Sequence, residues 1–232
     1  MEENKKDKLL KIIVEEYIRS AEPIGSAFVA EKYLKDSSPA TVRNHMAELE
    51  DEGLIFQPHT SAGRVPTLEG YKYYLANLLD RRELGGKNKK VLDESKKNFS
   101  DGREGVKALA KAIAELANST VLVGFSPLDV YYTGLANLFR QPEFAEHAQV
   151  YNMSDVIDHL DEVMAKVFFQ LDDEIKILVG AENPFGEMSS VVLTRCQIEG
   201  REGLLGIMGP SRMNYEENFG LVAYGREILK KV

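Results

Sequence analysis

The side chains best suited to chemistry in this chain lie in residues 37–46, where polar groups recur at helical spacing. Arg43 and Asn44 could recognise bases, because arginine forms a bidentate hydrogen bond with guanine and asparagine with adenine in the major groove. Ala40, one turn earlier, leaves room for close approach or for contact with a thymine methyl group. The stretch therefore has the residue types of a segment that reads double-stranded DNA.

A second polar segment, residues 57–67, follows closely. It holds small residues around Gly63, with Arg64 directly after. Small residues let a loop tip lie against a phosphate backbone or in a minor groove, where an arginine supplies positive charge. A helix followed at once by such a loop is how a winged helix-turn-helix protein contacts DNA.

The first segment needs a helix with a defined start and end. Ser38 is a favoured N-cap, and Pro39 suits the first helical position because an N–H there would have no helical partner. Gly53 is typical of a left-handed cap at the carboxyl end. The sequence therefore predicts a helix from Pro39 to about residue 52.

This predicted helix has two unlike sides. At 3.6 residues per turn, Val42, Met46 and Leu49 fall together and should face the core. The opposite side is small or hydrogen-bonding in its amino half and acidic in its carboxyl half. Because phosphates would repel the acidic half, the amino end should lead into a groove, with the positive end of the helix dipole towards the DNA. The acidic residues are Glu48, Glu50, Asp51 and Glu52.

The flanking sequence predicts the rest of a winged helix-turn-helix. Apolar residues at helical spacing and turn residues between them define each element. The predicted elements are helices over 5–20, 26–34 and onward from a cap at Thr67, a strand over 54–56, a turn over 60–63 and a returning strand at 64–65.

DNA contacts are expected from the amino end of the third helix, from the loop, and from the start of the second helix, a common place for a phosphate contact. A helical triplet with a hairpin also occurs in protein-interaction modules, and that alternative stays open. The candidate DNA contacts are Ser26, Ser38, Thr41, Arg43, Asn44, His45, His59, Thr60, Ser61, Gly63 and Arg64.

The charge balance argues mildly against nucleic-acid binding. The chain carries a formal net charge of −8, and residues 1–82 hold 12 Lys and Arg against 14 Asp and Glu, a net of −2. Any binding field must therefore come from a local patch, and the affinity should depend strongly on salt.

Composition indicates a globular protein of the cytoplasm. Hydrophobic residues make up 44% and charged residues 28% of the 232 residues. No apolar run reaches the length of a membrane span, and the charged N-terminus is unlike a secretory signal. The single cysteine, Cys196, excludes an internal disulfide, suits a reducing compartment and should be a buried thiol.

The remainder predicts an α+β domain with an antiparallel sheet. We expect a DNA-binding domain over 1–82, a linker over 83–103 that is partly helical around 91–98, and a regulatory or dimerisation domain over 104–232. The elements predicted for this domain are a helix over 104–120, a strand over 121–125, helical stretches around 128–139 and 154–170, strands over 175–180, 191–197 and 204–209, a hairpin turn over 199–202 and a helix over 215–232.

On these residues the chain resembles the HrcA family, the heat-inducible transcription repressors of bacteria. The most specific run is residues 58–67, which read PHTSAGRVPT. Matching runs also occur at both ends of the chain, at 22–26, 38–44, 180–183 and 206–215.

The resemblance implies a repressor of chaperone genes that binds an inverted-repeat operator as a homodimer, with its activity linked to a chaperonin. It implies a GAF-like C-terminal domain that carries an inserted dimerising segment. The sequence offers no motif for a cofactor or metal, and none is expected. It assigns the operator contacts to Ser38, Thr41, Arg43, Asn44, His45 and residues 59–64.

The chain departs from the family between residues 126 and 129, where relatives carry a long segment that includes the dimerising insertion. A dimer is still expected, because an inverted repeat matches the two-fold symmetry of a dimer. It would need a different surface, for which the strand over 191–197 or the helix over 215–232 are candidates.

Two other classes of function remain as alternatives. One is a ligand- or stress-sensing regulator with a different regulon, whose C-terminal domain binds a metabolite. The other is an enzyme, for which Asp155, His159 and Glu162 share a helical face that could bind a metal, although such faces are mostly solvated surface. The run 210–213 contains Arg212, which we interpret as structural within a buried turn.

Overall fold

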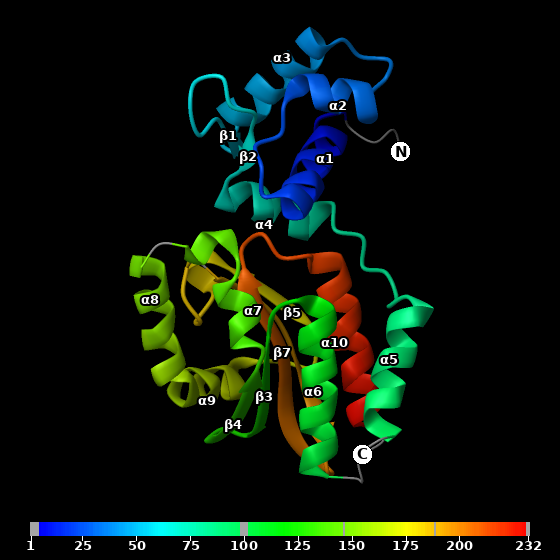
Figure 1. Ribbon diagram of the computed structural model, residues 1–232, viewed down its shortest axis with the longest axis vertical. Coiled ribbons are helices and arrows are strands. Elements are labelled where there is room, and N and C mark those ends of the chain that lie inside the picture. The colour runs from blue at the N-terminus through cyan, green and yellow to red at the C-terminus, as the bar shows by residue number, and fades with distance from the viewer. Residues whose placement is uncertain (1–4, 98–101, 146, 188, 231–232) are drawn as a thin grey trace. The chain divides into compact units, whose positions relative to one another are not determined.

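The chain forms two compact units, Met1–Asp80 and Arg81–Val232. The structure is a computed structural model that describes residues 5–97, 102–145, 147–187 and 189–230. Both units combine helices with antiparallel strands (Figure 1), so the predicted α+β class is confirmed. No helix in these residues is long and apolar enough to cross a membrane.

The first unit contains a helical part and a short antiparallel sheet, in which Ile55 pairs with Pro66 and Phe56 with Val65. Its predicted elements are all present, within a few residues of the expected bounds. The elements are α1 (Lys5–Ser20), α2 (Ser26–Lys32), α3 (Pro39–Asp51), β1 (Ile55–Phe56), β2 (Val65–Pro66) and α4 (Leu68–Asn77).

The apolar stripes of α1 and α3 form the core of this unit. Leu10 and Ile13 of α1 and Val42 of α3 are completely buried, and Met46 and Leu49 are at most 3% exposed. Burying each such side chain stabilises the fold by about 1.5–3 kcal/mol. The side of α3 predicted to face inward is therefore confirmed.

A buried carboxylate, Glu16, joins α1 to α2. It is 6% exposed and accepts hydrogen bonds from Arg19 Nη1 at 2.6 Å, from Lys32 Nζ at 3.2 Å and from the Tyr33 hydroxyl. Burial by itself raises the pKa of Glu16, but the hydrogen bonds from Tyr33 and Lys32 outweigh it, and the net pKa is lowered. Glu16 thereby holds the first two helices together.

Glu16→Gln is expected to lower the free energy of unfolding at pH 7 by about 1–3 kcal/mol, because the amide loses the charge-assisted hydrogen bonds. Because the pKa of Glu16 is lower in the folded protein than in the unfolded chain, its charge stabilises the fold at pH values above the unfolded pKa, near 4.5. This contribution is lost as the pH falls through the folded pKa. Urea unfolding between pH 3 and 7 measures both effects. Glu22→Gln, at an exposed position of the same unit, is the control. Equal stability curves for the two variants would contradict the assignment.

The second unit contains a five-stranded sheet in the order β4-β3-β7-β6-β5, with every neighbouring pair antiparallel. The elements are α5 (Gly86–Lys97), α6 (Arg103–Ala117), β3 (Thr120–Ser126), β4 (Asp129–Thr133), α7 (Leu135–Phe139), the 3-10 turn η1 (Pro142–Phe144), α8 (His147–Asp158), α9 (Leu160–Gln170), β5 (Lys176–Val179), the 3-10 turn η2 (Gly180–Glu182), β6 (Ser189–Ile198), β7 (Arg201–Pro210) and α10 (Tyr215–Leu229).

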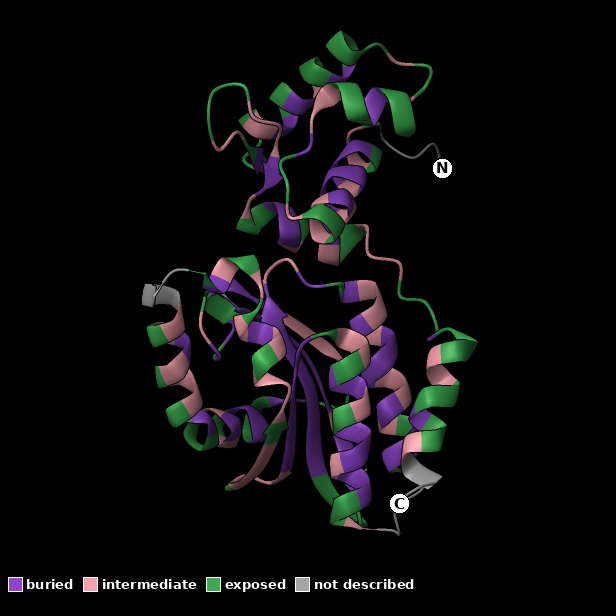
Figure 2. Cartoon of the chain, viewed as in Figure 1, coloured by how far each residue is buried: buried purple, intermediate pink, exposed green. Residues whose placement is uncertain are grey.

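Helices cover both faces of this sheet. A Cβ added at Gly225 of α10 would meet Leu205 of β7 and Ile113 of α6, so α6 and α10 share one face. A Cβ added at Gly124 of β3 would meet Met164 of α9 and Leu204, which places α9 on the other face. The central strands are buried along most of their length (Figure 2).

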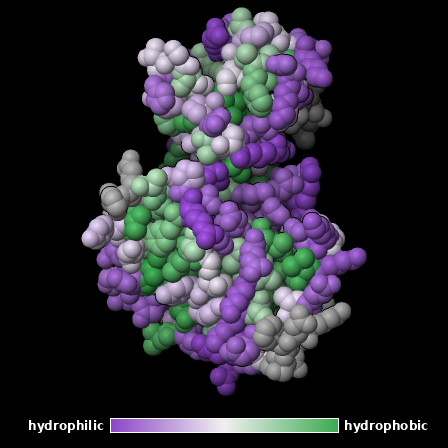
Figure 3. Space-filling view, in the orientation of Figure 1, coloured by the Kyte–Doolittle hydropathy of each residue, from purple (hydrophilic) through white to green (hydrophobic). Residues whose placement is uncertain are grey.

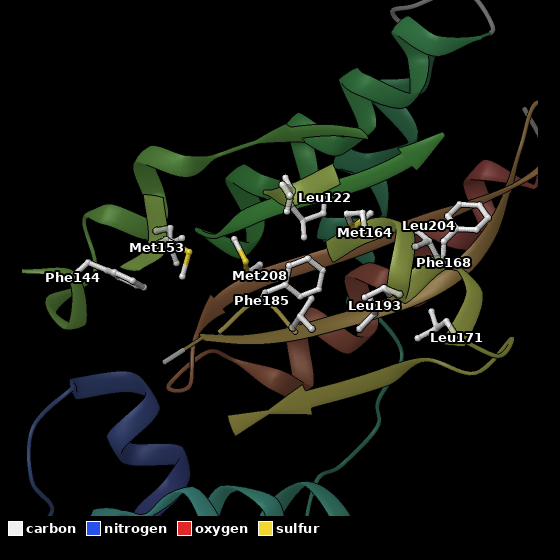
Figure 4. Packing of buried hydrophobic residues seen from close by; sticks show 14 residues of the cluster. Leu122, Phe144, Met153, Met164, Phe168, Leu171, Phe185, Leu193, Leu204 and Met208 are labelled. Carbon is white, nitrogen blue, oxygen red and sulfur yellow. The ribbon is translucent and has the colours of Figure 1, made fainter. Parts of the chain in front are cut away.

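An apolar cluster lies between the sheet and α7–α9. Figure 4 shows Leu122, Leu193 and Leu204 of the sheet beside Met164 and Phe168 of α9. Hydrophobic residues also gather on the surface of this side, as the green area over α7 and α8 in Figure 3 shows. The sheet is thus a two-sided layer with a core on each face.

Within the predicted linker over 83–103, the helix expected around 91–98 is present, but the segment belongs to the second unit instead of separating two domains. Residues 86–97 form α5, which packs on α6, and Leu92 is completely buried. Leu84 is also buried, at 7% exposure. Two well-placed leucines among many lysines are enough to dock this segment, because a helix needs only a narrow apolar stripe for packing. Residues 98–101 lie outside the described residues.

The helical stretch predicted around 128–139 is wrong over its first half. Residues 129–133 form β4, which pairs with β3 through Leu122↔Tyr132 and Val123↔Tyr131. Val, Tyr and Thr favour pleated strands over helices, and pairing with a buried strand adds to that preference. Only Pro127 and Leu128 separate the two strands, so the chain closes with a tight hairpin where family members were expected to carry the long segment.

Neither surface suggested for dimerisation is freely available. Strand β6 lies inside the sheet, paired with β7 along its length and with β5 from Ser190 to Leu193. Helix α10 buries eight of its residues against neighbouring elements, among them Leu221 and Ile228. The apolar residues of β6 and α10 belong to the core of the unit. From sequence alone, such residues look the same as those of a dimer interface.

Candidate nucleic-acid interface

The amino end of α3 is fixed by its own cap. Ser38 Oγ accepts a hydrogen bond from the backbone N–H of Thr41 at 3.1 Å and lies 2.9 Å from Thr41 Oγ1. Pro39 occupies the first turn, as predicted. Ser38 and Thr41 therefore have a structural role, while both side chains stay exposed at the positive end of the helix dipole.

The outer face of α3 presents the two side chains predicted to recognise bases. Arg43 and Asn44 are exposed, next to exposed Ala40 and Ala47. Within the described residues neither Arg43 nor Asn44 has a hydrogen bond or ion pair from its side chain. Their donors and acceptors are thus available to a ligand.

His45 lies at the edge of this face. Its side chain is 31% exposed, and its Nδ1 is 3.6 Å from the carboxylate of Glu48. That nitrogen is buried and makes no hydrogen bond in the part of the chain that is described. His45 is therefore turned partly into the unit, unlike Arg43 and Asn44.

Two cations of the unit, Lys6 and Arg64, partly neutralise the acidic half of α3. Lys6 of α1 lies 3.2 Å from Glu48 and 2.6 Å from Glu52. The hydrogen bonds to Glu52 and Glu48 raise the pKa of Lys6. The hydrogen bond from Lys6 in turn lowers the pKa of Glu48. Glu50 pairs with Arg64 of the hairpin. The repulsion of phosphates expected from this half is reduced but not removed, because Glu48, Asp51 and Glu52 are all exposed, and Glu48 and Glu52 share one lysine, Lys6.

The hairpin between β1 and β2 is tied to α3 through Glu50. Arg64 Nε and Nη2 both lie 2.9 Å from Glu50 Oε2, and the backbone N–H of Gln57 donates to Glu50 Oε1 at 3.1 Å. Gln57 Nε2 in turn donates to the carbonyl of Ala62 at 2.9 Å. The Arg64 side chain is only 16% exposed, so it serves as a brace between hairpin and helix.

Gly63 provides close contact between the hairpin and the start of α2. The backbone groups of Ile24 and Arg64 exchange two hydrogen bonds, at 2.9 and 2.8 Å. A Cβ on Gly63 would lie 2.4 Å from the carbonyl carbon of Ile24, which leaves no space for a side chain. Gly63 is therefore needed for packing.

The tip of the hairpin is open to solvent. His59, Thr60 and Ser61 are exposed, and the turn is closed by a hydrogen bond from the N–H of Ala62 to the carbonyl of His59 at 2.9 Å. Ser61 has a positive φ of 74°. Ser26 is half-buried as the first residue of α2, with Gly25 as the N-cap.

The structure thus separates the candidate residues into two groups. Those with exposed polar side chains are Ser38, Thr41, Arg43, Asn44, His59, Thr60 and Ser61, while Gly63 and Arg64 shape the hairpin. Ser26 and His45 are half-buried and belong to neither group. Sequence reasoning missed Glu50 and Gln57, which hold the hairpin in place. The sequence gives only a weak signal for the hydrogen bond between Gln57 and Glu50, seven residues earlier. This contact forms only because the hairpin folds back towards α3.

Replacing Arg64 by alanine is expected to loosen the hairpin, with a cost of about 1–3 kcal/mol in the free energy of unfolding. Glu50→Gln should cost a similar amount, and the double variant should cost less than the sum, because both changes remove one ion pair. A double-mutant cycle by urea unfolding measures the coupling. Additive effects would contradict a direct Arg64–Glu50 interaction.

The other candidate sites are structural or lack the geometry for chemistry. The described residues contain no group of three His, Cys, Asp or Glu side chains that could hold a metal, so Asp155, His159 and Glu162 do not form one. Burial raises the pKa of the Cys196 thiol to about 12, which makes it a poor nucleophile. Arg212 is 11% exposed and binds Glu143 at 2.7 Å, as a structural arginine should.

The comparisons with known proteins identify the family. A family model described as the HrcA protein C-terminal domain matches residues 42–218. This match covers well over half of the chain, so the protein belongs to the HrcA family.

Several curated relatives carry the name heat-inducible transcription repressor HrcA. The one from Pelotomaculum thermopropionicum is 41% identical over 122 residues, which are 52% of this chain and 35% of the relative. The chain therefore spans about a third of the length of this relative in that match. The one from Natranaerobius thermophilus is 26% identical over 94% of this chain and 93% of the relative.

Longer alignments show that this chain is shorter than its relatives. The alignment with the relative from Carboxydothermus hydrogenoformans spans 339 positions and includes 100% of this chain, which has 232 residues. More than a hundred positions of that relative therefore have no counterpart here. A solved structure described as a hypothetical protein at 2.2 Å resolution shares the fold, with a TM-score of 0.72, 18% identity and coverage of 99% of this chain and 98% of that chain.

Proposed function

We propose that this protein is a sequence-specific DNA-binding transcriptional repressor of heat-shock and chaperone genes. The observation that carries the proposal is the exposed pair Arg43 and Asn44 in the amino half of α3, whose side chains have no partner in the described residues. The hairpin braces the same helix through the Arg64–Glu50 ion pair. The name shared by its relatives, heat-inducible transcription repressor, supports the same class.

In this proposal the first unit is a winged helix-turn-helix. Helix α3 enters a major groove with its amino end leading, and Arg43 and Asn44 contact base edges. His59, Thr60 and Ser61 contact the phosphate backbone or a minor groove from the hairpin tip, and Ser26 contacts a phosphate. Gly63 and Arg64 act by holding the hairpin in position.

The proposed assembly is a homodimer on an inverted repeat, since two-fold protein symmetry matches two-fold DNA symmetry. The second unit would serve as a GAF-like regulatory and dimerisation domain, and a chaperonin is the proposed regulatory partner by resemblance to the family. With a net charge of −8, affinity should be modest and fall steeply with salt.

Selection of bound sequences from a random double-stranded DNA pool tests this function. The expected result is enrichment of one inverted repeat, whose half-site spacing reports the symmetry of the bound assembly. Sedimentation of the complex gives the number of chains. Failure to enrich any sequence at low salt, with folded protein confirmed by circular dichroism, would overturn the proposal.

A further inference from the structure

A cavity of 330 Å³ lies at one end of the sheet in the second unit, beside the carboxyl end of α10. Three cationic side chains line it, namely Arg195, Arg226 and Lys230. Two acidic residues, Asp173 and Glu202, also line it. The balance of charge depends on which of these groups are already paired.

Arg195 is bound within the chain through each of its three guanidinium nitrogens. Its Nη1 lies 3.0 Å from the carboxylate of Glu202, and its Nη2 donates to the carbonyl of Phe168 at 2.9 Å. Its Nε donates to the carbonyl of Leu171. Arg195 and Glu202 therefore cancel each other and frame the cavity.

Arg226 is anchored but not neutralised. Its Nη1 donates to the backbone carbonyl of Asp173 at 2.8 Å and to Thr194 Oγ1 at 3.2 Å, and both acceptors are uncharged. Its Nε and Nη2 have no hydrogen-bond partner among the described residues. These two N–H groups form one side of the planar guanidinium fork, which fits the two oxygens of a carboxylate or phosphate.

A further cation favours an anion there. Lys230 is exposed one turn after Arg226 and forms no ion pair in the described part of the chain. Strand β6 pairs with β5 only from Ser190 to Leu193, so β5 does not cover the part of β6 that holds Gln197. Asp173 lines the cavity with one exposed carboxylate against these two cations.

The cysteine in the lining adds no negative charge. Burial raises the pKa of Cys196 to about 12, so the thiol is neutral at physiological pH. The cavity volume is at the lower end of the range for small-molecule sites, which is about 300–1,000 Å³. A compact ligand with one or two anionic groups would fit.

We propose that this cavity is an effector site that binds the oxyanion of a small molecule, a carboxylate or a phosphate, in the free fork of Arg226, with Lys230 as the second cation. The site lies wholly within the second unit and does not depend on the proposed DNA-binding function. Its test uses no DNA, so the two proposals can fail separately.

The test is titration of the full-length protein with inorganic phosphate and, separately, with malonate, at constant ionic strength set by sodium chloride. Backbone amide NMR shifts and isothermal titration calorimetry follow binding, and the two arms distinguish phosphate from carboxylate. The expected result is saturable binding of at least one anion, with shifts confined to residues 195–197 and 226–230.

Three variants complete the test. Arg226→Lys keeps the charge but loses the fork, and should weaken binding by about tenfold. Lys230→Gln, at an exposed position, should weaken it several-fold. Lys8→Gln removes one exposed charge from the other unit and should change nothing. Absence of saturation in both arms, or equal affinity of all three variants and the unaltered protein, would overturn the proposal.

Discussion

Replacing Arg43 and Asn44 together by alanine is expected to abolish specific binding to the selected inverted repeat while leaving the protein folded. Each bidentate base contact contributes about 1–3 kcal/mol, so the double variant should lose roughly 30-fold to more than 10,000-fold in affinity. Thermal melting should be unchanged, because both side chains are exposed and have no partner in the described residues. A gel shift with specific and scrambled DNA measures the effect.

A matched control separates loss of recognition from loss of charge. Lys8→Ala removes one positive charge from an exposed position of α1. It should weaken binding to specific and to scrambled DNA slightly and equally. Single variants refine the assignment: Arg43→Ala should relax the preference for guanine at one position, and Asn44→Ala that for adenine. If the double variant retained the selected repeat as tightly as the unaltered protein, α3 would not be the recognition helix.

The parts of the fold that sequence could predict are those specified locally. The cap at Ser38, the proline at the first turn and the apolar stripe of Val42, Met46 and Leu49 act within one helix, and the structure contains all three features. The turn between β6 and β7 is also specified locally. Glu199 and Gly200 both adopt positive φ and form a two-residue hairpin loop. Short-range signals of this kind do not depend on the rest of the chain.

The features that sequence reasoning missed depend on contacts between distant segments. Arg64 pairs with Glu50, 14 residues earlier, only because the hairpin folds back onto α3. The partners of Glu16 become neighbours only when α1 and α2 pack. Arg226 and Thr194 are brought together by packing of α10 on the sheet. Each case is a charge placed by tertiary packing, which explains why a spacing rule does not find it.

Corrections to the candidate site have the same cause. Arg64 has the residue type of a DNA contact, but its side chain is directed to Glu50 and is mostly buried. A hairpin of this length has little core of its own, and an ion pair to the neighbouring helix compensates by fixing its angle. Specific recognition in this unit is therefore proposed for α3, with the hairpin tip adding affinity that is independent of sequence.

The hairpin's position should depend on Gly63 more than on any charge. Gly63→Ala would place a Cβ 2.4, 2.5 and 2.6 Å from the carbonyl carbon, the carbonyl oxygen and the nitrogen of Ile24. Backbone atoms cannot yield as a flexible side chain does, so the hairpin must move away and lose the two hydrogen bonds between Ile24 and Arg64. The expected cost is about 3 kcal/mol in the free energy of unfolding.

Hydrogen exchange and DNA binding together test this dependence on Gly63. In Gly63→Ala, amides of residues 55–66 should exchange faster while those of α6 and β7 keep their protection, and affinity for the selected repeat should fall by at least about tenfold. Gly25→Ser adds a Cβ where nothing lies within 4 Å and keeps a residue type favoured at an N-cap, so its stability should match the unaltered protein. Normal exchange and stability in Gly63→Ala would mean that the hairpin tolerates a side chain at this contact, and the proposed bracing of α3 would then be wrong.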